Sequence, residues 1–164
     1  MMIDEINLVI ITLSSMAPGF EARYAAPLAI SLGMKLEHAI LLTFPTSLVP
    51  ALILLMLSDK LMELLKILSS KRYLCNIALP IYNSVIRARE TVKQRFETAG
   101  YIGLALFVAI PLPLTGVWTA SIGASLLGLN KYKSFIAISI GNLIAIAITT
   151  GLLSIIIPFS KSIP

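Results

Sequence analysis

Charged residues are scarce in this chain of 164 residues. They make up 13% of the sequence, whereas about a quarter is usual in a soluble globular domain. Hydrophobic residues make up 57%, and the mean hydropathy is +0.92. The shortage of charge excludes an ordinary soluble domain and indicates a membrane protein.

Cysteine and histidine are nearly absent, since Cys75 and His38 are the only ones. One cysteine excludes an intrachain disulfide and a cysteine metal cluster, and the histidine has no neighbouring ligands, so no metal site is expected. The sequence has no nucleophile motif, phosphate loop or dinucleotide fingerprint, so no cofactor and no enzymatic activity are expected. Intramembrane hydrolysis is the least favoured class, because no activated serine, cysteine or histidine pair lies at membrane depth.

The basic residues are gathered in one block. The formal net charge is +5, and eight of the lysines and arginines lie between Lys60 and Arg95. Positive residues beside membrane spans mark the cytoplasmic side. The block is therefore predicted to be a cytoplasmic segment near anionic lipid head groups, and no nucleic-acid partner is expected.

Two uncharged runs have the length of membrane spans. A bilayer core needs roughly 20 apolar residues of helix, and the runs 39–57 and 134–160 meet that requirement. Transmembrane helices are predicted over 39–57 and 134–158. The linking segment 58–99 begins with an amphipathic stretch, which indicates cytoplasmic helices at the membrane interface.

Two further apolar stretches, 6–34 and 100–130, have awkward lengths. Each is too long for one crossing of about 17 to 25 residues and too short for two. Proline prevents a regular helix from continuing, so each stretch is predicted to be a re-entrant hairpin with its tip inside the membrane. Four full crossings are the alternative. The residues assigned to the tips are Pro18, Gly19 and Pro27, and then Pro111 and Pro113.

The two halves of the chain share this layout. A shift of 95 residues aligns Pro18 with Pro113, Gly33 with Gly128 and Ser47 with Asn142. Because a hairpin returns to its own side and the next helix crosses once, the second copy would be inverted relative to the first, as in many transporters. This topology places ten Lys and Arg residues inside and two outside, against nine and three for four full crossings, so charge favours the hairpins slightly. The predicted fold is a single all-α integral membrane domain over residues 1–164, with two inverted repeats.

Glu21 and Arg23 are the only charges well inside an apolar stretch. A charge at the bilayer centre costs about 3 kcal/mol, so such residues usually face a partner or a transport path. Burial and a neighbouring arginine act in opposite directions on the proton affinity of a carboxylate, as a proton-coupled group requires. Glu21 is therefore predicted to be a protonatable gate. The alternative is a structural ion pair.

The second tip supplies the opposing residues. A half-helix that starts near Thr115 and Gly116 would present free amides to a phosphate or carboxylate, and Arg23 would add a charged fork. Trp118 is assigned either to the cavity or to an aromatic belt at the lipid interface. Asn142 is assigned either to a bond between helices or to the pathway. The predicted substrate- or proton-binding residues are thus Glu21, Arg23, Thr115, Gly116, Trp118 and Asn142.

The stretches "PGFEARYAAPLAISLGM" and "GLALFVAIPLPLTGVWTASIGASLLGL" resemble the prokaryotic family called putative small multidrug export proteins. Its first loop usually reads Glu-x-Arg-x-x-x-Pro and its second close to Phe-Val-Ala-x-Pro-x-Pro-x-Thr-Gly-x-Trp. Leu114 departs from the glycine that is frequent there. The family is distantly similar to DedA and VTT-domain membrane proteins, and that resemblance implies paired re-entrant loops and lipid movement in a prokaryotic cell membrane.

The expected function is proton-coupled translocation of a lipid phosphate or an amphipathic small molecule. An uncoupled lipid scramblase and a scaffold or assembly factor without transport activity are the alternatives. Two units of this size barely enclose a cavity, so a homodimer is expected, with membrane lipids as further partners.

Overall fold

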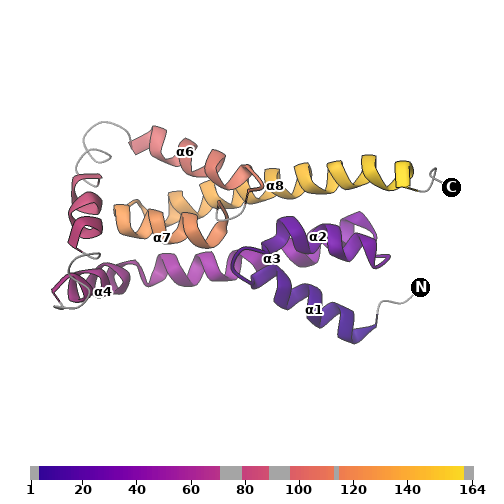
Figure 1. Cartoon of the computed structure of the whole chain (residues 1–164), viewed down its shortest axis with the longest axis horizontal. Coiled ribbons are helices and arrows are strands. Elements are labelled where there is room, and N and C mark those ends of the chain that lie inside the picture. Colours follow the sequence, from indigo (N-terminus) through magenta and orange to yellow (C-terminus); the bar gives the residue numbers. More distant parts are fainter. Residues whose placement is uncertain (1–3, 71–78, 89–96, 113–114, 161–164) are drawn as a thin grey trace.

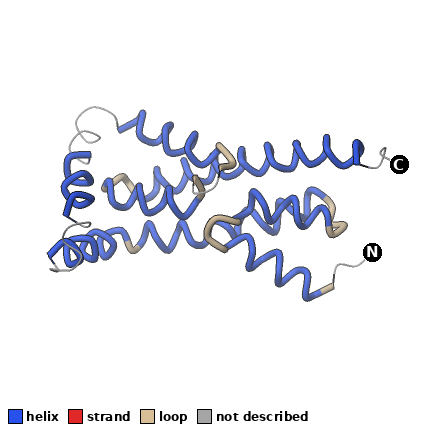
Figure 2. The backbone as a smooth tube through the Cα atoms, viewed as in Figure 1, coloured by secondary structure: helices blue, strands red, loops and turns tan. Residues whose placement is uncertain are grey.

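The computed structural model describes residues 4–70, 79–88, 97–112 and 115–160. All regular structure in these ranges is helical, as Figure 2 shows, so the predicted all-α class is confirmed. Pro113 and Leu114 lie outside the described residues, and so does Cys75.

The first half contains α1 (Glu5–Met16), α2 (Glu21–Ser31) and α3 (Leu36–Met56). Helix α1 ends before Pro18, and Gly19 takes a φ of 84° in the turn that follows. Glycine adopts this left-handed region at little cost, so the chain can reverse here. Pro27 lies within α2 and not in the turn to which the sequence assigned it. It has no amide to donate to the carbonyl of Arg23, four residues earlier.

The second half contains α6 (Glu97–Ala109), α7 (Val117–Leu127) and α8 (Lys131–Ser160). It follows α4 (Ser58–Ser70) and a further helical segment over 79–88. Gly128 caps the C-terminus of α7 with a φ of 68°, and the amide of Leu129 donates to the carbonyl of Ala124 at 3.0 Å. Asn130 caps the N-terminus of α8. Its Oδ1 accepts from the amide of Tyr132 at 3.0 Å and from the amide of Lys133 at 3.1 Å.

The helices form two hairpins on two long helices. The α1–α2 hairpin and the α6–α7 hairpin open towards opposite ends of the molecule, while α3 and α8 run along both of them (Figure 1). The two hairpin turns meet near the middle of the molecule (Figure 2). Helix α6 packs closely on α8 because Gly141 has no side chain. A Cβ there would overlap the carbonyl oxygen of Ala105.

Within the described ranges, two helices are long and apolar enough to cross a membrane, namely Leu36–Met56 and Lys131–Leu152. Many large apolar side chains cover the outer surface of the helices, and Leu41, Ile6 and Met56 are among them. Water would disfavour so much exposed apolar surface, whereas lipid does not. Polar residues turn inward instead. The buried polar and charged residues of these helices include Ser15, Glu21, Arg23, Thr43, Ser47, Ser121, Ser125, Ser134, Asn142 and Thr150.

Candidate functional site

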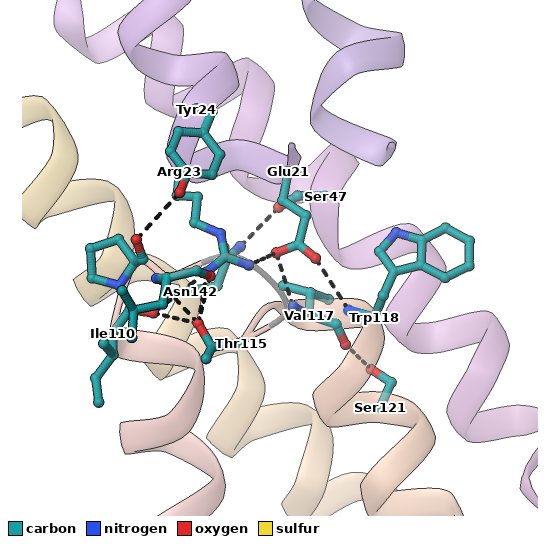
Figure 3. A network of polar contacts seen from close by, with 12 residues as sticks. Glu21, Arg23, Tyr24, Ser47, Ile110, Thr115, Val117, Trp118, Ser121 and Asn142 are labelled. Atoms are coloured by element: carbon teal, nitrogen blue, oxygen red, sulfur yellow. Dashed lines mark hydrogen bonds and ion pairs between the residues drawn. The ribbon is translucent and has the colours of Figure 1, made fainter. Parts of the chain in front are cut away.

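Glu21 and Arg23 form a buried ion pair where the two hairpin turns meet (Figure 3). Arg23 Nη2 donates to Glu21 Oε2 at 2.8 Å, and each of the two side chains is 2% exposed. Both residues belong to the first turn of α2. A charge pair with so little access to water depends on its hydrogen bonds, since burial of either charge alone is costly.

The carboxylate of Glu21 caps the N-terminus of α7. Glu21 Oε2 accepts from the amide of Val117 at 2.9 Å, and Oε1 accepts from the amide of Trp118 at 3.4 Å. The first amides of a helix have no partner inside the helix and carry the positive end of its dipole, so an anion is stabilised there. The residue before the helix, Gly116, supplies no side-chain cap of its own. The first half of the chain therefore caps a helix of the second half.

The backbone of Glu21 adopts a left-handed conformation where its carboxylate contacts α7. Its φ is 54°, and it is the only residue other than glycine with a positive φ in the described part of the chain. A side chain makes the left-handed region unfavourable, and such strain is concentrated at functional sites. Figure 3 shows the carboxylate pointing away from α2 towards Val117 and Trp118.

Gly116 provides the space for the ion pair. A Cβ at this position would overlap both carboxylate oxygens of Glu21 and Nη2 of Arg23. No other residue type fits beside the pair unless the pair moves. Gly116 was predicted as a binding residue, and the structure places it against the two charged side chains.

The second Arg23 nitrogen, Nη1, binds the turn after α6. It donates to the carbonyl of Leu112 at 3.1 Å and lies 3.2 Å from Thr115 Oγ1 and 3.5 Å from the carbonyl of Ile110. These carbonyls have left the regular helix, and buried carbonyls need a donor. The arginine thus joins both hairpins, while its Nε has no hydrogen-bond partner in the part of the chain described here.

Three further predicted residues reinforce the tips. The hydroxyl of Thr115 lies 2.6 Å from the carbonyl of Ile110, so it bonds to its own turn. The indole Nε1 of Trp118 donates to the carbonyl of Met16 at 3.0 Å, which ties α7 to the end of α1. Asn142 Nδ2 donates to Ser47 Oγ at 2.8 Å beside the ion pair, and both are 1% exposed. The predicted site residues are therefore brought together from helices α2, α7 and α8 and from the turn before α7.

The proline and glycine residues assigned to the tips differ in their exposure. Pro18 and Gly19 are exposed in the first turn, and Pro111 is partly buried in the second. The carbonyl of Pro111 accepts from the hydroxyl of Tyr24 at 3.3 Å. Sequence reasoning missed Tyr24, although its position directly after Arg23 could have suggested a place in the same contact.

The polar groups of the site are few in kind. No group of three or more histidine, cysteine, aspartate or glutamate side chains could hold a metal ion among the described residues. The site offers one carboxylate, one guanidinium, helix amides and a hydroxyl. These groups bind anions and exchange protons.

Two potential spans in the described part of the chain and a buried ion pair are features expected of a helical membrane protein. The family model described as "putative small multi-drug export protein" matches residues 21–148, and the chain belongs to this family. A family of export proteins places the chain with transporters and not with enzymes. No curated protein and no solved structure matches the chain.

Proposed function

We propose that the protein couples protons to the translocation of a lipid phosphate or an amphipathic small molecule across a prokaryotic cell membrane. The observation that carries this proposal is the buried Glu21–Arg23 pair at the contact between the two hairpin turns. A carboxylate that joins two separate parts of a transporter can control their separation by gaining or losing a proton.

The proposal includes two inverted repeats with re-entrant hairpins. After a shift of 95 residues, the starts of α1, α2 and α3 fall within a few residues of the starts of α6, α7 and α8. The ends of α1 and α2 likewise fall within a few residues of the ends of α6 and α7. The left-handed glycines after α2 and α7, Gly33 and Gly128, also correspond. Ser47 and Asn142, which are 95 positions apart, bond to each other. Residues related by a two-fold axis meet in this way when they lie close to the axis.

The hairpins would reach only half way across the bilayer. Helices α1, α2, α6 and α7 have 11 to 13 residues each, about half the length that a span requires. With α3 and α8 as the spans, the turns and the ion pair would lie near the bilayer centre. The block Lys60–Arg95 would then be cytoplasmic, and the N-terminal hairpin would open to the other side.

The mechanism follows from the contacts of Glu21. A neutral carboxylic acid no longer attracts the guanidinium of Arg23 or the dipole of α7 as strongly as a carboxylate does. Protonation would therefore weaken the contact between the first hairpin and the second. The tips could then separate towards one side and return after the proton leaves, which exposes the site alternately to the two sides.

Flux through proteoliposomes tests the proposal. The wild type should move a fluorescent lipid phosphate or an amphipathic dye in response to a pH gradient, and Glu21→Gln should remove that response. A matched control is Glu37→Gln, because Glu37 is exposed in the first turn of α3, away from the tips. Equal rates in the wild type and Glu21→Gln would contradict the proposed role of Glu21.

An uncoupled lipid scramblase is the second candidate. Pro18, Gly19 and Phe20 are exposed at the first tip, so a lipid could approach the tip from the side. A scramblase would equilibrate lipids without a gradient, and its activity would survive Glu21→Gln. The same exposure supports a homodimer, because irregular backbone at membrane depth is tolerated where protein covers it.

A further inference from the structure

We infer that the carboxylate of Glu21 is an internal ligand of an anion site, and that a monoanionic group of the substrate takes its place together with one proton. This inference rests on the proposed function, because it names the substrate class and the coupling of that same site. The proposed function left two substrate classes open, a lipid phosphate and an amphipathic small molecule. The inference favours the anionic lipid phosphate over an amphipathic molecule that carries a positive charge.

The position that the Glu21 carboxylate occupies has the composition of an anion site. Three donors converge on it, from Arg23 Nη2 and from the amides of Val117 and Trp118. The amides belong to the N-terminus of an 11-residue helix, whose dipole favours negative charge. All three donors point at one acceptor group, which is the arrangement that binds phosphates and carboxylates in proteins.

Arg23 offers a donor that Glu21 does not use. The Nε–H of a guanidinium and one Nη2–H are parallel and form a fork that suits two oxygens of one anion. Glu21 bonds to Nη2 only, and Nε has no hydrogen-bond partner among the described residues, although the side chain is 2% exposed. Glu21 Oε2 accepts from Arg23 Nη2 and Val117, and Oε1 accepts from Trp118, but neither oxygen bonds to Nε. An anion that approaches the fork can accept from Nε and Nη2 together, so the site offers a phosphate or carboxylate group one donor more than Glu21 uses.

Charge balance links the anion to a proton. In the resting state one carboxylate neutralises one guanidinium. A second anion would place two negative charges against Arg23, and an ionised Glu21 displaced into apolar surroundings would be unpaired, which is strongly unfavourable. If Glu21 binds a proton as it leaves, the hydrogen bonds from Arg23, Val117 and Trp118 pass to the anion and the site stays neutral. One monoanion thus enters with one proton.

The backbone favours this exchange. Glu21 holds a φ of 54° while its carboxylate caps α7, and departure of the side chain allows the backbone to relax. A cation has no comparable route into the site. Three donors already occupy the oxygens of Glu21, and Arg23 repels a second positive charge at this position.

Proton uptake during ligand binding tests the inference. The full chain, purified in a neutral detergent and weakly buffered with a pH dye, would be titrated with short-chain phosphatidylglycerol, whose phosphodiester is a monoanion near neutral pH. We expect one proton to be taken up per molecule bound. Glu21→Gln should bind the same lipid with no proton uptake and with higher affinity, because the internal competitor is neutral. Phosphatidylcholine of equal chain length and dodecyltrimethylammonium should bind at least tenfold more weakly.

A second variant covers the case in which Glu21→Gln does not fold. Glu21→Gly removes the side chain and accepts the positive φ, and added formate should then raise its Tm by occupying the donors, with no such rise in the wild type. Three results would overturn the inference: proton uptake that persists in Glu21→Gln, preferential binding of dodecyltrimethylammonium, or no effect of formate on Glu21→Gly.

The proposed function can fail separately. Proton-linked binding of phosphatidylglycerol without flux in proteoliposomes would keep the anion site and reject transport. Flux that depends on Glu21 without proton-linked binding of phosphatidylglycerol would keep transport and reject the exchange.

Discussion

The carboxylate of Glu21 accepts a hydrogen bond from the amide of Val117 at 2.9 Å, although the two residues are 96 positions apart. This bond joins the beginning of one half-length helix, α2, to the beginning of another, α7. Both helices are too short to cross a bilayer alone. The contact between their N-termini therefore marks how far each hairpin reaches towards the other.

Substitution of Gly116 by alanine should displace the ion pair. The new Cβ would overlap Glu21 and Arg23, which are buried and cannot both move into water. Disruption of a buried ion pair costs about 3 kcal/mol, so we expect a lower Tm in detergent and loss of flux. The control is Gly123→Ala in the same helix, where a Cβ meets nothing within 4 Å. That variant should be at least as stable as the wild type, and equal stability of the two variants would contradict the packing described here.

Replacement of Arg23 by lysine should fail although it keeps the charge. One ammonium cannot reach both Glu21 Oε2 and the carbonyl of Leu112, which Arg23 contacts with two different nitrogens. The loss of a hydrogen bond to a charged group costs about 1.5 to 3 kcal/mol. We expect a lower Tm and a reduced transport rate. Lys66→Arg is an exposed control, and wild-type behaviour of Arg23→Lys would show that the fork is not needed.

Ser47 and Asn142 should be energetically coupled. Each side chain is buried, and their bond of 2.8 Å joins α3 to α8. Polar bonds between transmembrane helices average about 0.6 kcal/mol in double-mutant cycles and reach about 1.7 kcal/mol. Unfolding of Ser47→Ala, Asn142→Ala and the double variant would measure the coupling. The exchange of the two residues, Ser47→Asn with Asn142→Ser, should restore most of the lost stability. Purely additive effects would rule out a direct interaction.

Trp118→Phe should loosen the contact between α7 and α1. A phenyl ring keeps only part of the packing of the indole, and the bond from Nε1 to the carbonyl of Met16 disappears at a further cost of about 1 kcal/mol. Thermal unfolding followed by circular dichroism would measure this, since Trp118 is the only tryptophan and its fluorescence is lost with it. Phe135→Leu, a partly buried position of α8, is a control for general loss of aromatic packing. An unchanged Tm in Trp118→Phe would show that the bond contributes nothing.

The all-helical class and the two long apolar helices were predictable from the sequence, because apolar runs of this length and prolines leave few choices. Pro18 and Pro111 each lie just beyond a helix end, and two uncharged runs make up most of the long helices α3 and α8. The presence of Pro27 inside α2 was not predicted. A proline ends a helix by default, and only packing around α2 can offset the missing hydrogen bond.

The composition of the site was predictable, but its internal contacts were not. Glu21 and Arg23 stand out as charges in an apolar stretch, and the amides after Thr115 stand out as the start of a half-helix. The sequence could not show that Glu21 itself binds those amides, because that contact joins distant residues and needs a φ of 54° that glutamate rarely adopts. The bond from Trp118 to Met16 was missed for the same reason of distance.

Capping across the two halves also has a consequence for biosynthesis. When the first hairpin leaves the ribosome, Glu21 and Arg23 have each other, but the amides and carbonyls that complete their bonding lie about ninety residues further along the chain. At roughly 5 to 20 residues per second, the ribosome needs on the order of 5 to 20 s to produce them. During that interval the nascent segment carries an incompletely solvated ion pair. The insertion machinery, or water at the membrane surface, must stabilise this ion pair until the second hairpin has been synthesised.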